Sequence, residues 1–142
     1  MKKILILNGP NLNLLGVRQT DVYGEKTLDE LISEIKVAFP NENIIHIQSN
    51  HEGVLIDKLH EYGFDFDGIV FNAGAYTHTS IALADAVRSI KTPVIELHIS
   101  DINKREAYRQ KSFLTEVCQH HIIGEGVEGY FKAVEYFIHQ DD

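Results

Sequence analysis

The sequence ILIL at residues 4–7, closed by NGP at residues 8–10, is a short unbroken apolar run that ends at a turn. Such a run is typical of a strand buried on both faces of a parallel sheet. Similar short runs follow at residues 44–47, 69–71, 94–98 and 122–123. Segments with helical spacing of apolar residues separate them, at residues 28–39, 54–62, 80–90 and 127–138. This alternation predicts an α/β domain whose sheet carries helices on both faces.

Turn and capping residues mark the ends of these elements. Thr27 is a candidate N-cap, and Glu30 three positions later completes a capping box. Gly63 is expected to end the helix that precedes it. Residues 11–24 show neither a helical nor a strand period, so we expect a long loop of functional importance. Residues 103–118 are polar with a few apolar anchors, and we expect them to be helical in part.

The order of the elements limits the topology. Because crossovers between parallel strands are right-handed, a flavodoxin-like order is favoured for five strands. We therefore predict a flavodoxin-like three-layer sandwich with a five-stranded parallel sheet, formed by one domain over residues 1–142. In such sheets, ligands bind where the carboxyl ends of the strands meet.

Composition and charge exclude several classes of protein. The chain has 142 residues, 44% hydrophobic and 24% charged, and its formal net charge is −8. This balance is globular, and its acidity disfavours a nucleic-acid binder. No apolar run approaches the ~20 residues of a membrane helix, and the N-terminal run is too short for a signal peptide. Cys118 is the single cysteine, which argues against disulfides and a cysteine zinc site. We expect a cytoplasmic enzyme or binding domain.

The residues that follow the strands are polar and rich in amides. They include Asn11, Asn13, Arg18, Tyr23, Asn72, Gly74, Tyr76, Thr77, His78, His98, Ser100, Asp101, Asn103, Arg105 and Arg109. No lysine lies in these loops before Lys104, so a Schiff-base mechanism lacks a candidate. The histidines and aspartates show no short metal-ligand spacing, so we expect no metal.

A tyrosine close to an arginine has a chemical use. A free phenol titrates near ~10 and is a poor base at neutral pH. A nearby guanidinium favours the phenolate and lowers that pKa. Arg18 and Tyr23 share one loop and could form such a pair; the alternative is that Tyr23 only packs at the end of the loop.

Two nucleotide-binding motifs match only in part. The sequence GEGVEG at residues 124–129 fits the dinucleotide fingerprint, but the acidic residue that must follow about 20 positions later, on a further strand, has no place before residue 142. We expect these glycines to form a turn before the last helix. The segment 9–16 is bounded by glycines but lacks the Gly-Lys-Ser/Thr of a phosphate loop.

Four motifs in register resemble the type II 3-dehydroquinate dehydratases. They are GPNLNLLG at 9–16 with Arg18 and Tyr23-Gly24, QSNHEG at 48–53, NAGAYTHTS at 72–80, and ELHIS at 96–100 followed by Arg105 and Arg109. The resemblance covers essentially the whole chain. One departure is Gln19-Thr20, where the family usually has Glu-Pro or a similar pair, and it bears on the stiffness of the loop.

The resemblance implies a hydro-lyase of the shikimate pathway, the route to chorismate and the aromatic amino acids. Its reaction is the anti elimination of water from 3-dehydroquinate, through an enolate, to give 3-dehydroshikimate. It also implies a flavodoxin-like fold, a homododecamer built as a tetramer of trimers, and no metal or cofactor. The lysine-free loops agree with the type II mechanism, because the type I enzymes use a lysine imine.

The chemistry of this elimination requires a tuned base and a donor for the enolate oxygen. Guided by the resemblance, we expect Tyr23, as phenolate, to take the C2 proton. Arg18 would lower its pKa and stabilise the transition state, and Asn11 would orient a water on the enolate. His98 would protonate the departing C1 hydroxyl, with Glu96 orienting its ring.

The remaining expected site residues contact the hydroxyls and carboxylate of the substrate. They are Asn72, His78, Asp85, Ile99, Ser100 and Arg109, with Gly74 in support. Structural alternatives stay open: Asn72 could cap a turn, His78 could start a helix, and Asp85 could be one charge on a helix face. Asp85 and Arg109 could also reach across a subunit boundary.

Two other functions compete with this hypothesis. A non-catalytic flavodoxin-like module would bind a flavin or nucleotide, but no phosphate loop is present. A phosphoacceptor domain needs aspartates after the first and third strands, where this chain has Asn8 and Asn72. We interpret Cys118 and the other histidines, His46, His60, His120, His121 and His139, as structural or surface residues.

Overall fold

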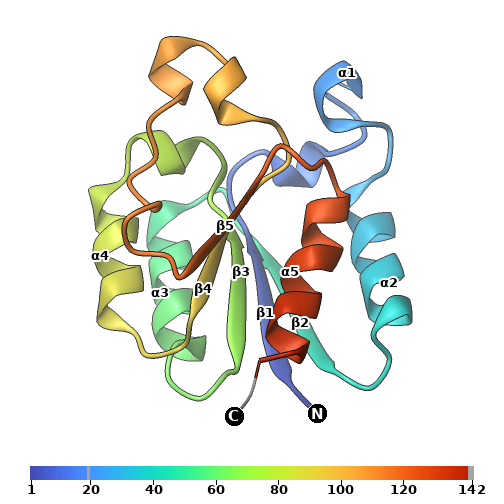
Figure 1. Ribbon diagram of the computed structural model, residues 1–142. Helices are drawn as coiled ribbons and strands as arrows, with labels where there is room; N and C mark the ends of the chain where they lie inside the picture. The colour runs from blue at the N-terminus through green and yellow to red at the C-terminus, as the bar shows by residue number, and fades with distance from the viewer. Residues whose placement is uncertain (19, 141–142) are drawn as a thin grey trace.

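A five-stranded parallel sheet forms the centre of the computed structural model (Figure 1). The model describes residues 1–18 and 20–140, with only the backbone of Val22 and Tyr23. The strands run in the order β2-β1-β3-β4-β5. Their bounds are β1 Lys3–Asn8, β2 Asn43–Gln48, β3 Gly68–Asn72, β4 Val94–His98 and β5 His120–Ile123. This order confirms the flavodoxin-like prediction.

Helices cover both faces of the sheet, as expected. One face packs against α2 (Leu28–Ala38) and α5 (Glu128–Ile138), the other against α3 (Glu52–Tyr62) and α4 (Ile81–Ser89) (Figure 1). Ile4 and Ile6 belong to the first core and Leu5 and Leu7 to the second. The run at 4–7 is apolar throughout because alternate side chains of a strand enter opposite cores. No described helix is long and apolar enough to cross a membrane.

The predicted capping residues account for the helix ends. The Thr27 side chain accepts from the Glu30 backbone amide, and the Glu30 carboxylate accepts from the Thr27 backbone amide, which confirms the capping box. Gly63 ends α3 as expected, but its φ is −85° and not left-handed. Glycine is needed there for space, since a Cβ would lie 2.3 Å from the Leu59 carbonyl oxygen and 2.5 Å from the Ile90 side chain.

Two loops differ from the expectation. The first loop is interrupted by a 3-10 turn, Leu12–Leu14, and by the short helix α1, Thr20–Tyr23. After β4 the expected partial helix is reduced to two 3-10 turns, Ile102–Lys104 and Ala107–Arg109. The chain beyond them is held by Leu114, which is 1% exposed in the second core. Tertiary anchoring therefore replaces helical hydrogen bonding in this segment.

Candidate active site

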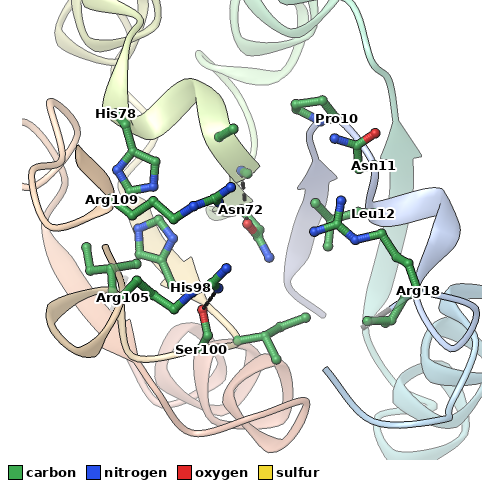
Figure 2. A pocket seen from close by; sticks show the side chains of 15 residues that line it. Pro10, Asn11, Leu12, Arg18, Asn72, His78, His98, Ser100, Arg105 and Arg109 are labelled. Carbon is green, nitrogen blue, oxygen red and sulfur yellow. Dashed lines mark hydrogen bonds between the residues drawn. The ribbon is translucent and has the colours of Figure 1, made fainter. Parts of the chain in front are cut away.

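A cleft opens at the carboxyl edge of the sheet, where the prediction placed the site. It lies between the first loop and the segment after β4 (Figure 2). Nine predicted site residues line it: Asn11, Arg18, Asn72, Gly74, His78, His98, Ile99, Ser100 and Arg109. Arg105 also lines it. The ends of β1, β3 and β4 thus bring together residues that are far apart in the sequence.

Close backbone packing fixes the floor of this cleft. The Gly9 amide donates to the Asn72 carbonyl at 2.7 Å, and a Cβ on Gly9 would lie 2.5 Å from the Ala73 carbonyl oxygen. Asn11 adopts a left-handed backbone conformation with φ 69°, and its backbone amide donates to Asn50 Oδ1 at 3.0 Å. The loops after β1, β2 and β3 therefore hold one another in place, and Asn11 is presented to the cleft.

A buried polar network supports Asn72 from beneath. The Tyr130 hydroxyl on α5 donates to Asn8 Oδ1 at 2.6 Å and accepts from Asn72 Nδ2 at 3.0 Å. Asn72 Oδ1 accepts from the Gly74 backbone amide at 3.1 Å, so Asn72 does cap the turn after β3, one of the alternatives that the sequence left open. Burial raises the pKa of the Tyr130 phenol, which stays neutral. Asn72 both caps the turn and lines the cleft, with its amide group fixed by this network.

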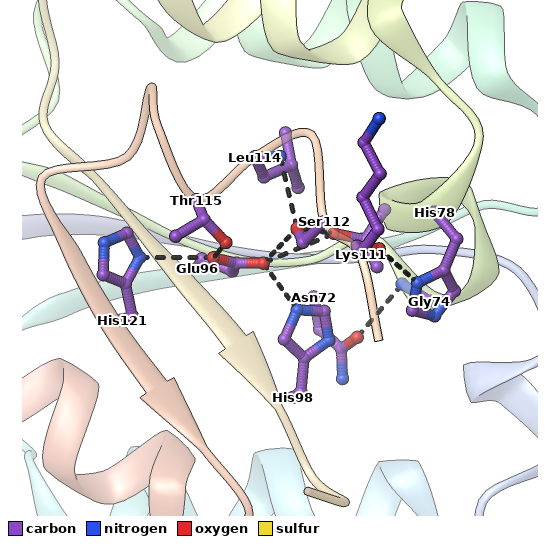
Figure 3. Close-up of polar contacts among 11 residues, drawn as sticks. Asn72, Gly74, His78, Glu96, His98, Lys111, Ser112, Leu114, Thr115 and His121 are labelled. Carbon is purple, nitrogen blue, oxygen red and sulfur yellow. Dashed lines mark hydrogen bonds and ion pairs between the residues drawn. The ribbon is translucent and has the colours of Figure 1, made fainter. Parts of the chain in front are cut away.

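His98 is held by a buried carboxylate (Figure 3). Its Nε2 lies 2.7 Å from Glu96 Oε2, and the two side chains are 6% and 0% exposed. Burial raises the pKa of the Glu96 carboxyl, but the hydrogen bond and charge of His98 outweigh it, with help from Ser112 and Thr115, and hold this pKa at about 2. Glu96 is therefore an anion at neutral pH, as the orienting role expected of it requires.

Positively charged and imidazole side chains face one another across the cleft. Figure 2 shows Arg18 on the side of the first loop and Arg105 and Arg109 on the opposite side. Arg105 Nη1 donates to Ser100 Oγ at 3.2 Å, and Arg109 Nε lies 3.0 Å from Glu106 Oε2. Such guanidinium groups suit the binding of a carboxylate.

His78 presents a neutral ring to the same cleft. Burial lowers the pKa of His78, against the effect of its hydrogen bond to the Lys111 carbonyl, and the positive charges of His98, Arg109 and Arg105 lower it further. Nδ1 lies 2.7 Å from that carbonyl oxygen, so Nδ1 carries the proton. The ring is thereby fixed at its back, and Nε2 can accept a hydrogen bond from a ligand hydroxyl.

Of the three remaining predicted site residues, Glu96 lies behind His98 and does not itself line the cleft, and the other two are Asp85 and Tyr23. Asp85 is exposed on α4 and does not line it. Tyr23 lies on α1, but its side chain is outside the described structure, as is Gln19. Among the described residues, no group of three His, Cys, Asp or Glu side chains could hold a metal ion.

Comparison with known proteins places this cleft in a family. Residues 2–138 match the family described as dehydroquinase class II. The chain belongs to this family. A class II dehydroquinase assignment agrees with the flavodoxin-like sheet order and with the four motifs, all of which fall inside the matched residues.

Named relatives of this class II dehydroquinase cover nearly the whole chain. A 3-dehydroquinate dehydratase of Bacillus pumilus (strain SAFR-032) is 51% identical over 140 residues, 97% of this chain and 95% of the relative. A catabolic 3-dehydroquinase of Phaeosphaeria nodorum (strain SN15) is 48% identical over 137 residues, 95% of this chain and 90% of the relative. The crystal structure of a type II dehydroquinase from Butyrivibrio crossotus DSM 2876 superposes with a TM-score of 0.93 at 43% identity, covering 96% of this chain and 97% of that one.

Several partners in the class II dehydroquinase site escaped the sequence analysis. Tyr130 comes from the last helix, and only its isolated hydroxyl on an apolar helix face signals a buried polar role. Two further residues contact Glu96 Oε1: the Thr115 hydroxyl donates to it at 2.8 Å, and His121 Nδ1 lies 3.2 Å from it. His120 and His121 face opposite sides of β5, because His120 stacks on Tyr136 of α5 while His121 contacts Glu96. The pairing of Glu96 with His121 across two parallel strands was missed.

Proposed function

We propose that this chain is a 3-dehydroquinate dehydratase, which removes water from 3-dehydroquinate by anti elimination to give 3-dehydroshikimate in the shikimate pathway. Membership of the class II dehydroquinase family supports the reaction. The observation that carries it is the imidazole of His98, which lines the cleft and is bonded from behind to the buried anion Glu96. A general acid must be both protonated and correctly oriented, and Glu96 favours both conditions.

His98 is the general acid in this proposal. Its Nε2 is bonded to Glu96, which leaves Nδ1 as the atom that can serve a substrate. The imidazolium gives its proton to the departing C1 hydroxyl, which leaves as water. Because Glu96 stays ionised while His98 loses and regains its charge, the ring keeps one orientation through the cycle.

Tyr23 is the proposed base and Arg18 its activating cation. Arg18 lines the cleft, and the backbone of Tyr23 follows it on α1. The phenolate takes the C2 proton, and the electrons of the C–H bond form the enolate. Asn11, at the start of the first loop, orients a water that donates to the enolate oxygen. Tyrosine and histidine supply both proton transfers, so the reaction needs no metal or cofactor, and dialysis against a chelator should leave turnover unchanged.

The other cleft residues bind the substrate. Asn72, His78, Ser100 and the backbone at Ile99 supply donors and acceptors for hydroxyl groups and the carboxylate. Arg109 adds a charge-assisted contact. Gly74 has a φ of 60°, and a Cβ there would approach the Pro10 carbonyl oxygen to 3.0 Å, so glycine keeps the two loops together.

Asp85 acts in this proposal from a neighbouring copy of the chain, within a dodecamer built from trimers. Asp85 is exposed on α4, next to Ile81, an apolar side chain that is 60% exposed. An interface over α4 would cover that apolar surface and carry Asp85 toward another cleft. Light scattering of the purified protein tests the assembly, and the trimeric interface is refuted if the protein is a monomer at assay concentrations.

The activity is tested by adding 3-dehydroquinate and following the ultraviolet absorbance of the conjugated enone. His98→Asn and Tyr23→Phe should each lower kcat by about 10²–10⁴-fold, the contribution of a general acid or base. Near-full turnover by either variant refutes the role of that residue. Arg18→Ala should lower the rate and move the pH profile to alkaline values. Borohydride with substrate should not inactivate the enzyme, because no imine forms.

A further inference from the structure

We propose that His121 is a positioning residue for the general acid: it shares the Glu96 carboxylate with His98 and sets how firmly His98 holds its proton. The proposal rests on the proposed function only for the catalytic meaning of His98. The shared contact and its titration can be measured without substrate.

The two imidazole rings take opposite oxygens of one carboxylate. His98 Nε2 lies 2.7 Å from Oε2, and His121 Nδ1 lies 3.2 Å from Oε1. Glu96 and His121 are paired in the parallel register of β4 and β5, so the contact is set by the sheet itself. Figure 3 shows the two histidines on either side of Glu96.

The rest of the carboxylate is surrounded by groups that do not change charge. Thr115 donates to Oε1 at 2.8 Å, and Ser112 and Thr77 donate to Oε2. The Cys118 thiol also senses Glu96, but burial, followed by the charge of Glu96, raises its pKa and keeps it neutral. Proton exchange around Glu96 is therefore centred on the two histidines.

His98 meets further charges on its cleft side. Arg105 and Arg109 line the same cleft, and their guanidinium groups stay charged at every working pH, while the ring of His78, which also lines it, is neutral. Their effect on His98 is therefore constant, while that of His121 depends on its own protonation.

Exposure gives His121 access to solvent protons. Its side chain is 35% exposed, whereas Glu96 is 0% exposed and His98 6%. A proton on His121 draws the negative charge of Glu96 toward Oε1 and weakens its attraction for the proton on His98. The two rings therefore form a coupled pair around one carboxylate, so that the protonation of one affects the other.

The test is an NMR titration of the histidine rings in the ligand-free protein. The His98 signals are identified by their loss in His98→Asn. His121→Gln keeps an amide donor for Glu96 but cannot carry charge. In this variant the His98 midpoint should rise, because the charge that competes for Glu96 is gone, and the titration should become a single step. His120→Gln is the matched control, because His120 faces the other side of β5, and it should leave the His98 curve unchanged.

Each result decides the proposal. An unchanged His98 midpoint in His121→Gln, or an equal shift in His120→Gln, overturns it. If His121→Gln does not fold, the wild-type curves decide, because coupling requires a shared inflection in the His98 and His121 signals. Where turnover is measured, the limb of the kcat/KM profile that reports His98 should move with its midpoint. A shifted midpoint in a protein without dehydratase activity would refute the proposed function and leave this inference standing.

Discussion

Replacing Tyr130 by phenylalanine tests the link between the hydrophobic core and the cleft. Tyr130 is fully buried on α5, and its hydroxyl joins Asn8 at the end of β1 to Asn72 at the end of β3. Tyr130→Phe keeps the ring and its packing, so no large cavity is created. The variant removes only the oxygen that serves the two asparagines.

The cost follows from the groups left without that partner. Asn8 Oδ1 loses a bond of 2.6 Å and Asn72 Nδ2 one of 3.0 Å, both in the protein interior. Each orphaned buried group costs ~1–3 kcal/mol, so for two groups we expect a loss of about 2–6 kcal/mol in the free energy of unfolding. For a chain of this length that corresponds to a decrease in Tm of about 7–20 °C. Because the Asn72 side chain also loses one of the two hydrogen bonds that orient it, KM should rise more than kcat falls.

Urea denaturation and steady-state kinetics measure the two effects. Tyr136→Phe is the matched control on the same helix: its hydroxyl is near the surface and accepts a bond of 3.4 Å from Gln119. We expect that control to change stability by less than about 0.5 kcal/mol, as surface substitutions do. A Tyr130→Phe variant as stable as Tyr136→Phe would refute the view that the asparagines depend on this hydroxyl.

Three further substitutions test other parts of the structure. Glu96→Gln should lower kcat by about 10²-fold, because His98 loses its anionic partner. The pKa of Glu96 is about 2 in the folded chain, below its ordinary value of 4.5, so the stability that Glu96 adds is present above pH 4.5 and is lost as the pH falls toward 2. The urea midpoint of the variant should therefore depend less on pH in this acid range than that of the wild type. Gly9→Ala should lower the free energy of unfolding by about 1–3 kcal/mol, because the new Cβ would lie 2.5 Å from the Ala73 carbonyl oxygen. Its control is Gly53→Ala, which should not destabilise the fold because the space around its Cβ is open. Burial, then the charge of Lys36, lowers the pKa of His46 to about 4. The unfolded chain therefore binds more protons than the folded chain between pH 6.5 and 4, so stability should fall as the pH is lowered through this window. His46→Gln should remove this fall in the urea midpoint.

The fold was predictable because its signals are local. The apolar run at 4–7 and the pair Thr27 and Glu30 each define an element within a few residues, and the structure confirms both. The cleft was predictable for a geometric reason, since parallel strands bring the residues that follow them to one edge. This rule placed Asn72 and His98 together although 26 positions separate them in the sequence.

The network behind the cleft was not predictable from local signals. Tyr130 lies 122 positions from Asn8, and their hydrogen bond depends on how α5 crosses the sheet. His121 contacts Glu96 only because β4 and β5 pair in that register. The segment after β4 has a composition compatible with a helix, but Leu114 packs into the second core and only two 3-10 turns form in place of an α-helix. In each case a tertiary contact decides what the sequence pattern leaves open.

The distribution of charge reconciles an acidic protein with an anionic substrate. The chain carries a net charge of −8, yet Arg18, Arg105 and Arg109 line the cleft. Screening limits the repulsion from distant surface carboxylates to about 8–10 Å at physiological salt, so the local arginines dominate the field that a bound carboxylate experiences. Glu96 is fully buried behind His98 and does not line the cleft, so it does not compete with a bound carboxylate for these arginines. In the proposed mechanism, burying the Glu96 anion behind His98 therefore lets the same cleft attract an anionic substrate and hold its general acid in place.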